Sequence, residues 1–350
     1  MSGSRITFLD GQSGQPQALE RVMARVRRQL DGPALDRLRA VERPLLAGIG
    51  ASYAALAVPL EVLRGHGVPA QRVFSSEIED GLRGFDTDLL IGVSQGGRSS
   101  DTIAAFKAAQ GVPTLAVLNV TPSPLGELAD LTVDMGNEPD SYASTIGFTA
   151  AVVALDLIAG AIAGRADDPW DGIAAHAGTV RARAARVVGA LRSRAARCVA
   201  ADCVASGASR VSAEEAALLL REVPRMPAAA SVTRNYLHGE MESAGNTLHL
   251  VFGDGREVEL ARSLSAAGHL TLLITTRDVK AADSLGVVRL PPCPPSARVV
   301  LETVVAQELV AALSDERDVP IESFVFANDD TKEGGVDPAD FELASPVAAA

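Results

Sequence analysis

The sequence LLAGIGAS (45–52) is an apolar run that ends in a glycine turn. Its apolar part predicts a strand, and its glycines predict a turn into a helix that begins near Tyr53. Three similar runs follow, and segments of helical length lie between them. They are DLLIGVS (88–94), PTLAVLN (113–119) and LTVDMG (131–136). Strands that are apolar throughout and alternate with helices indicate a parallel sheet covered on both faces.

The second half of the chain repeats this order. Four runs take the equivalent places: CVASGAS (203–209), TLHLVFG (247–253), LTLLITT (270–276) and VVRLP (287–291). Because the repeated unit contains four predicted strands with the segments between them, it predicts duplicated domains and not a solenoid, whose units are shorter. The predicted fold class is therefore α/β, with two tandem doubly wound parallel-sheet domains of the flavodoxin-like type.

Domain boundaries are expected where the pattern changes. We predict an N-terminal helical segment (1–40), a first domain (41–172), a connecting helix (173–200), a second domain (201–318) and a C-terminal tail (319–350). The connecting segment is rich in Ala and Arg at helical spacing, and we expect it to pack on both domains. The tail is polar, and either it is loose or it covers a site.

The composition fits two globular domains. Of the 350 residues, 47% are hydrophobic and 22% charged, which is enough apolar material for sizeable cores. The net charge of -12, without a basic run, argues against nucleic-acid binding. We expect no membrane association, because the longest apolar stretch, 148–163, is too short for a span and contains Asp156.

The cysteines and the start of the chain indicate the compartment. Cys198, Cys203 and Cys293 are odd in number and lack CxxC spacing, so we expect reduced thiols, no metal site and no cofactor. The first residues show neither a charged nor an apolar signal region. The predicted location is therefore the cytoplasm.

Two loops of the first half are suited to an anion. In open parallel sheets, ligands bind at the carboxyl ends of the strands. One loop contains Ser52, and the other, 94–102, combines glycines with several hydroxyls at a helix start, where phosphate binds well. A serine-rich helix start is equally typical of capping. The equivalent loop of the second half, 253–257, carries acidic residues and should repel phosphate.

Four segments carry a resemblance to a known family: GIGASYAA (48–55), VSQGGRSSDT (93–102), GNEPDSYASTIGFTAAV (136–152) and GASRVSAEEAALLLREV (207–223). They resemble the SIS (sugar isomerase) domains of the isomerase half of glucosamine-6-phosphate synthase and of related aminosugar-phosphate deaminases and deglycases. The resemblance covers nearly the whole chain. It implies two tandem SIS domains, a small-molecule sugar phosphate as ligand and a homodimer with a shared active site.

The resemblance also implies roles for individual residues. The phosphate-binding set is matched by Ser52, Ser94, Gln95 and Ser99, and a substrate-contacting serine by Ser144. Glu222 matches the catalytic glutamate, and a carboxylate beside a carbonyl carbon can transfer the proton for isomerisation or deamination. His238, sixteen residues later, matches the histidine that opens the sugar ring in the neighbouring subunit's site.

Several positions depart from the family pattern. Gly96 replaces a serine, and Ile146 and Leu219 replace lysines, so positive charge is expected to be missing from the site. The family's tail lysine has no equally spaced counterpart. Lys332, the tail's only lysine, either takes that catalytic place or is a solvated charge.

These observations favour a sugar-phosphate isomerase or deaminase that transfers a proton next to a carbonyl or imine. Because residue 2 is serine and not the required cysteine, we expect no glutaminase activity. Two alternatives remain open: a non-catalytic sugar-phosphate sensor, and a deglycase that acts on a phosphorylated sugar-amine adduct. The Glu222 and His238 pair favours an enzyme, whereas the missing lysines favour a sensor.

Overall fold

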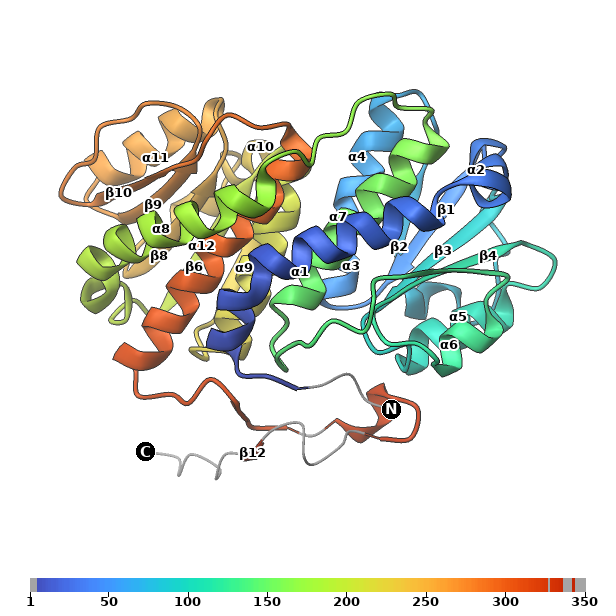
Figure 1. The fold of residues 1–350 in the computed structure, drawn as a ribbon. Coiled ribbons are helices and arrows are strands. Elements are labelled where there is room, and N and C mark those ends of the chain that lie inside the picture. Colours follow the sequence, from blue (N-terminus) through green and yellow to red (C-terminus); the bar gives the residue numbers. More distant parts are fainter. Residues whose placement is uncertain (1–4, 327, 336–341, 344–350) are drawn as a thin grey trace. The chain divides into compact units, whose positions relative to one another are not determined.

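The chain folds into two compact units. The computed structural model describes residues 5–326, 328–335 and 342–343. Unit 1 comprises Met1–Asp168 and Glu322–Ala350, and unit 2 comprises Pro169–Ile321 (Figure 1). The chain thus returns to unit 1 after completing unit 2, and the tail is part of the first unit.

Unit 1 is built on a five-stranded parallel sheet in the order β2-β1-β3-β4-β5, which is the flavodoxin-like order. Its strands are β1 (Pro44–Gly48), β2 (Gln71–Phe74), β3 (Leu89–Ser94), β4 (Thr114–Leu118) and β5 (Leu131–Asp134). The four runs predicted for this half are confirmed as strands. The edge strand β2 was not predicted, because Val73 is its only buried residue and no apolar run marks it.

Helices cover both faces of this sheet. Helices α1 (Phe8–Gln29) and α4 (Ala57–Gly65) contact α7 (Ile146–Ile162) on one face, and α5 (Ser100–Ala108) and α6 (Pro124–Leu128) lie on the other (Figure 1). The shorter helices are α2 (Gly32–Arg39), α3 (Ala51–Ala55) and the 3-10 turn η1 (Ser75–Ile78). The structure therefore buries the apolar strands from both sides, as their composition requires.

A glycine in the middle of β3 lets α5 approach the sheet. A Cβ at Gly92 would lie 2.2 Å from a ring carbon of Phe106, which is itself buried. The Phe106 ring instead packs into a cluster with Leu45, Leu90 and Ile103. This packing holds the start of α5, and with it the loop after β3, at a defined height above the sheet edge.

Unit 2 repeats the topology with the order β10-β9-β8-β6-β7, again all parallel. Its strands are β6 (Ala200–Ala205), β7 (Ala228–Val232), β8 (Thr247–Phe252), β9 (Leu270–Thr275) and β10 (Leu285–Arg289). The two tandem doubly wound sheets predicted from the repeat are confirmed. The missed strand β7 occupies the same edge position as β2, and it too is largely exposed.

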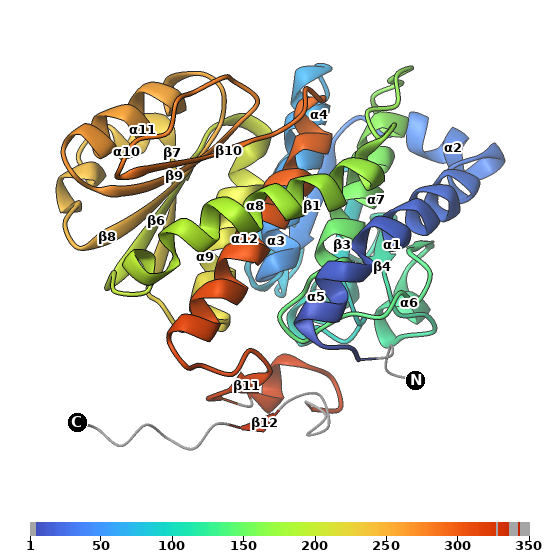
Figure 2. The same cartoon turned by 60° about the vertical axis from the view of Figure 1, so that its left-hand side comes forward.

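Helices α8 (Ile173–Ala195), α9 (Arg210–Glu222) and α12 (Pro295–Glu316) cover one face of this sheet, and α10 (Thr233–Tyr236) and α11 (Arg256–Ala266) the other (Figure 2). The turns η2 (Gly207–Ser209) and η3 (Glu240–Ser243) complete the unit. Helix α8, predicted as the connecting helix, packs on α12 and β10 of its own unit. Helix α9 ends at Glu222, as Pro224 and Pro227 predict.

The tail contributes β11 (Ser323–Phe324), the turn η4 (Asp329–Thr331) and β12 (Glu342–Leu343), and β11 and β12 pair in parallel. No helix in the described ranges is long and apolar enough to cross a membrane. In the same ranges, no group of three His, Cys, Asp or Glu side chains is placed to hold a metal ion.

Candidate functional site

A cavity of about 560 Å³ lies in unit 1 at the carboxyl ends of β3 and β4. Its walls come from the loop after β3, the loop after β4, the segment before α7, and residues near both ends of the chain. They are Arg5, Ile49, Ser94, Gln95, Gly96, Arg98, Ser99, Val120, Pro122, Ser123, Pro124, Asp140, Ser141, Tyr142, Ser144, Thr331 and Lys332. Of the predicted site residues, Ser94, Gln95, Ser99, Ser144 and Lys332 line this cavity.

The loop after β3, residues 94–99, is held firmly and is called the β3 loop below. The carbonyl oxygen of Gln95 accepts two backbone hydrogen bonds, from Asn119 and Val120, each at 3.0 Å. Gly97 has a φ of +63°, and a Cβ there would lie 2.1 Å from the Ser123 hydroxyl. Only glycine fits this position, so the β3 loop is shaped by its packing against the loop after β4.

Ser99 precedes helix α5, but its side chain does not cap the helix N-terminus. It is the N-cap residue, but its side chain makes no capping hydrogen bond, and its hydroxyl accepts instead from the Thr102 hydroxyl at 3.2 Å. The capping explanation of this serine therefore fails. The helix N-terminus, with its partial positive charge, faces the β3 loop without a side-chain cap from Ser99.

A buried carboxylate that the sequence reasoning missed organises the other side of the cavity. Asp140 accepts the Ser144 hydroxyl at 2.6 Å, and the Thr145 backbone and hydroxyl at 2.9 and 3.0 Å. The Ser144 oxygen in turn accepts the backbone N–H of Phe148 at 2.8 Å. Because its proton is used by Asp140, Ser144 can meet a ligand only as an acceptor in this arrangement.

Groups of different chemistry line the cavity. The Asp140 carboxylate accepts hydrogen bonds from hydroxyls, which suits a sugar. The β3 loop offers serine hydroxyls, backbone N–H groups and a helix N-terminus, which suit phosphate. Asp140 could not be singled out from the sequence, in which it is one polar residue among several in PDSYAST.

The expected loss of positive charge is wrong for this cavity. Arg5, Arg98 and Lys332 all line it. The Arg5 guanidinium donates to the Ser141 carbonyl at 3.2 Å and lies 5.6 Å from the centre of the Tyr142 ring. Residues far away in the sequence thus supply cations where the family lysine at position 146 is absent.

Tyr142 contacts Arg5 near the start of the chain and two residues of the tail. The Lys332 ammonium lies 5.1 Å from its ring centre, within the range of a cation–π contact. Phe324 packs edge-on against the same ring, with centroids 4.2 Å apart. The Glu322 carboxylate also accepts the backbone N–H of Phe8 at 3.0 Å, at the start of α1. Of the described tail residues, Thr331 and Lys332 line the cavity.

Ser52 is placed differently from the other predicted phosphate ligands. It lies in the first turn of α3, where its backbone N–H donates to the Ile49 carbonyl at 3.1 Å, and it is not among the residues that line the cavity. Its neighbour Tyr53 stacks on Phe74 at 3.9 Å and beneath Arg72 at 4.4 Å. The predicted role of Ser52 in phosphate binding stays a prediction.

Glu222 and His238 belong to unit 2. Glu222 is the last residue of α9, and burial raises the pKa of its carboxyl to about 7. A carboxylate with a pKa near neutrality is well suited to accept and return a proton. His238 is exposed in the turn after α10, where its backbone N–H donates to the Asn235 carbonyl at 2.9 Å. Its action in a partner's site stays a prediction.

At the equivalent strand ends of unit 2, which we call its filled crevice, the polar side chains bond to one another. Asp254 follows β8 and accepts the Thr275 and Thr276 hydroxyls, the Thr276 backbone N–H and the Arg298 guanidinium, all within 2.8 Å. Glu257 accepts the Thr233 hydroxyl at 2.6 Å and the Gly255 backbone N–H at 3.2 Å. The carboxylates of the acidic loop thus accept the hydrogen bonds that these donors could otherwise give to a bound anion.

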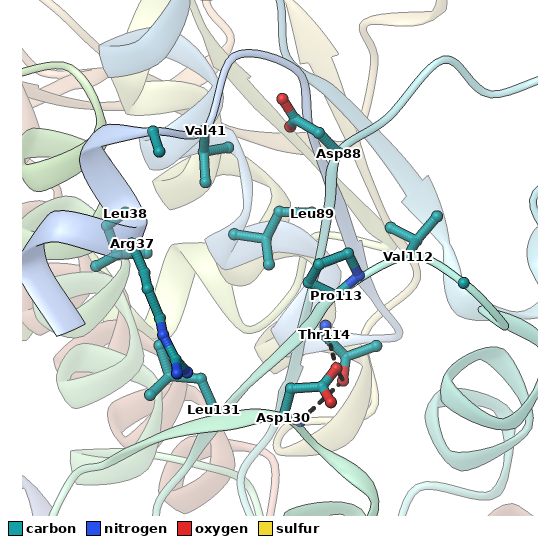
Figure 3. A pocket seen from close by; sticks show the side chains of 12 residues that line it. Arg37, Leu38, Val41, Asp88, Leu89, Val112, Pro113, Thr114, Asp130 and Leu131 are labelled. Atoms are coloured by element: carbon teal, nitrogen blue, oxygen red, sulfur yellow. Dashed lines mark hydrogen bonds between the residues drawn. The ribbon is translucent and has the colours of Figure 1, made fainter. Parts of the chain in front are cut away.

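A larger hollow of about 670 Å³ lies at the opposite edge of the unit 1 sheet, near the amino ends of β3 and β4 (Figure 3). Its lining is mostly apolar, as with Leu38, Leu89 and Leu131. Its two carboxylates are used internally, since Asp130 accepts the backbone and hydroxyl of Thr114, and Asp88 the backbone of Glu42 and Arg43. The smaller cavity therefore has the better chemistry for a polar ligand.

Comparison with known proteins identifies the first domain. The SIS domain model matches residues 38–161, which include β1 to β5 and the β3 loop. Residues 38–161 are similar to a SIS domain. Two curated relatives are glutamine–fructose-6-phosphate aminotransferases (isomerizing), from Pyrococcus horikoshii, 33% identical over 126 residues, and Aquifex aeolicus, 31% over 124. Each match covers 34% of this chain, and the chain spans only 21% of the length of these relatives.

Solved structures extend the similarity in fold to both units of the chain. The C-terminal domain of glucosamine-fructose-6-phosphate aminotransferase from Francisella tularensis has a TM-score of 0.77 at 18% identity, over 91% of this chain and 98% of that chain. Tagatose-6-phosphate ketose/aldose isomerase from Escherichia coli has a TM-score of 0.71 at 17% identity, over 88% and 92%. Glucosamine-6-phosphate deaminase from Thermotoga maritima has 0.68 at 16%, over 87% and 95%. The tandem SIS architecture predicted from the sequence is confirmed as a fold.

Proposed function

We propose that this protein is a sugar-phosphate isomerase or deaminase. The observation that carries the proposal is the cavity of the SIS domain, where a serine-lined loop at a helix N-terminus lies beside basic side chains. Proteins of the same fold are named for reactions of fructose, glucosamine and tagatose 6-phosphates. A hexose phosphate or aminohexose phosphate is the substrate class that fits these names and this cavity.

The β3 loop binds the phosphate in this proposal. Ser94 and Ser99 donate hydroxyl hydrogen bonds, Gln95 donates its amide, and the helix N-terminus adds its dipole. Ser52 completes the set from the neighbouring loop. Ser144 and Asp140 then accept hydrogen bonds from the sugar hydroxyls.

Proton transfer is the task of Glu222. Moving a carbonyl between C1 and C2, or releasing ammonia from C2, requires a base beside the carbon that loses its proton. The raised pKa of Glu222 matches this requirement near neutral pH. Lys332 and His238 assist at the ring and carbonyl oxygens, with His238 supplied by the second subunit of a homodimer.

Two other functions compete with this one. In a non-catalytic sensor, the cavity binds the sugar phosphate and Glu222 has no chemical role. In a deglycase, the same proton transfer releases an amine from a phosphorylated sugar-amine adduct. The raised pKa of Glu222 favours either enzyme over the sensor, because a sensor has no use for a base that titrates near pH 7.

The test is a substrate panel in which released ammonia, released amine and ketose formation are measured. The panel contains glucosamine 6-phosphate, fructose 6-phosphate with ammonia, tagatose 6-phosphate and glycated amino-acid phosphates. Turnover of one member at an enzymatic rate supports the proposal and selects between isomerase, deaminase and deglycase. Thermal stabilisation by the sugar phosphates without any turnover supports the sensor.

Binding is measured in parallel so that it can be separated from chemistry. Ser94→Ala should lose the thermal shift that a sugar phosphate causes, whereas Ser265→Ala, which removes a hydroxyl from α11 of unit 2, should keep it. An unchanged thermal shift in Ser94→Ala would show that the phosphate binds elsewhere.

A further inference from the structure

Arg98 connects the β3 loop to the tail by both its backbone and its side chain. The Arg98 carbonyl accepts the backbone N–H of Glu333 at 2.8 Å, and Ser99 pairs with Lys332 as an isolated antiparallel bridge. The guanidinium donates from Nε to the Glu333 carbonyl at 2.8 Å and from Nη2 to the Gly335 carbonyl at 2.7 Å. Arg98 therefore holds Glu333 and Gly335, and we call these contacts the clasp.

The tail is shaped to receive this guanidinium. The backbone N–H of Gly335 donates to the Lys332 carbonyl at 2.9 Å, which closes a tight turn. Gly334 and Gly335 have φ values of +79° and +77°, a region that favours glycine. A Cβ at Gly334 would lie only 3.0 Å from Nη2 of Arg98, so a side chain at that position would push against the clasp.

The clasp determines where Lys332 lies. Lys332 is the first residue of the clasped turn, and its ammonium is placed beside Tyr142 at the cavity wall. The planar fork of arginine can reach two carbonyls at once, whereas lysine, a point charge, has no such fixed geometry. Arg98 thus acts on the site through the tail, at a position between two predicted phosphate-binding residues.

We infer that Arg98 is a positioning residue that couples anion binding in the β3 loop to docking of the tail, and so places Lys332 in the cavity. The inference rests on the proposed function for the role of Lys332, but the coupling itself requires no turnover. Linkage makes the effect reciprocal: if docking strengthens anion binding, the anion strengthens docking by the same factor.

Hydrogen–deuterium exchange of the 331–335 amides, with and without inorganic phosphate, tests the coupling in the full-length protein. In wild type, phosphate should slow this exchange. In Arg98→Gln the exchange should be fast and insensitive to phosphate, and phosphate affinity should fall about fivefold or more, the lower end of typical coupling factors.

Two further variants separate the clasp from a direct contact between Arg98 and phosphate. Arg98→Lys keeps the charge and loses the fork, and Gly334→Ala keeps Arg98 and disturbs the tail. Both should behave like Arg98→Gln. Gly67→Ala is the control for backbone strain, because Gly67 has a φ of +80° with open space around it, and it should behave like wild type.

The outcomes decide the inference separately from the proposed function. Unchanged tail exchange in Arg98→Gln overturns it, and so does wild-type phosphate affinity in both Arg98→Lys and Gly334→Ala. If a panel substrate is turned over, Lys332→Met should lower kcat, and adding Arg98→Gln should lower it no further. If the clasp is confirmed but no substrate reacts, the proposed function fails and the coupling stands.

Discussion

The two units have the same sheet order but use the carboxyl ends of their strands in opposite ways. In unit 1 the loop after β1 contains Gly50-Ala51-Ser52, and in unit 2 the loop after β6 contains Gly207-Ala208-Ser209. Beside the first lies an open cavity with serine donors. The Ser209 hydroxyl instead donates to Glu302 at 2.9 Å and accepts from Arg298 at 2.9 Å. Of the two copies of one architecture, one has a polar cavity at these strand ends, and in the other the polar side chains bond to one another.

The filled crevice shows what replaces an anionic ligand. Arg298 donates to Asp254 and lies 3.1 Å from Glu302, whose other oxygen accepts the Ser212 hydroxyl at 2.6 Å. Burial by itself would raise the pKa of Asp254, but hydrogen bonds from Thr275 and Thr276 and the Arg298 charge outweigh it and lower that pKa. The chain's own carboxylates are thus held as a bound anion would be.

The largest expected effect concerns chemistry. If unit 1 binds and unit 2 supplies the base, Glu222→Gln should lower kcat by about 10²- to 10⁴-fold and leave phosphate binding unchanged. Wild-type turnover should rise as the pH passes about 7, because the carboxylate form is the active base. Steady-state kinetics on the substrate found in the panel measure both. Equal kcat values for wild type and variant would remove Glu222 from the mechanism.

The next effect concerns the stability of the filled crevice. Arg298→Met should destabilise unit 2 by about 3–5 kcal/mol, because it leaves the fully buried Glu302 without its cationic partner. Urea unfolding followed by fluorescence reports on this unit, since the single tryptophan, Trp170, is buried in it. Adding Glu302→Met should restore most of the loss. A single variant as stable as wild type would mean that the network is not what fills this crevice.

A matched serine pair compares the two units directly. Ser94→Ala should weaken phosphate binding about 10- to 100-fold with little change in stability, since a hydrogen bond to a charged group contributes about 1.5–3 kcal/mol. Ser209→Ala should do the reverse, lowering stability by about 1–3 kcal/mol and leaving affinity unchanged. Calorimetric titration with phosphate and urea unfolding measure the pair. Similar losses of affinity in both variants would contradict the difference between the crevices.

The smallest effect is a pH dependence of stability. The pKa of Glu222 is about 7 in the folded chain, against an ordinary value of 4.5, so the folded state favours the protonated form. That contribution is fully present below about pH 4.5 and is lost as the pH rises through about 7. At pH 8, Glu222→Gln should therefore be more stable than wild type by about 1–2 kcal/mol. The gap should close toward pH 4.5, and a gap that is constant with pH would exclude a carboxyl whose pKa is raised in the folded chain.

Local burial patterns explain which parts of the fold could be predicted. Eight strands were visible because runs such as DLLIGVS are apolar throughout, which is required when both faces of a sheet are covered. The edge strands β2 and β7 could not be predicted, since each has only one buried residue. They are defined by pairing with the neighbouring strands β1 and β6. The serine-rich β3 loop was predicted as a site from its composition and from its place after a strand.

The remaining site residues depend on contacts across the chain. Arg5 meets Asp140 and Ser141, Tyr142 meets Phe324 and Lys332, and Arg98 meets the tail. No spacing in the sequence encodes these pairs, because side chains more than a hundred residues apart are brought together only when the sheet is assembled.

The sequence by itself determined the duplicated architecture and the different chemistry of the two equivalent loops, since hydrophobic period and loop composition are local properties. Only the tertiary structure decided that Asp254, Arg298 and Glu302 bond to one another in unit 2, while Arg5 and Lys332 line the cavity of unit 1. The physical reason is that a charged side chain satisfies its hydrogen bonds with whatever the fold places within about 3 Å, and that neighbour is chosen by packing and not by sequence distance.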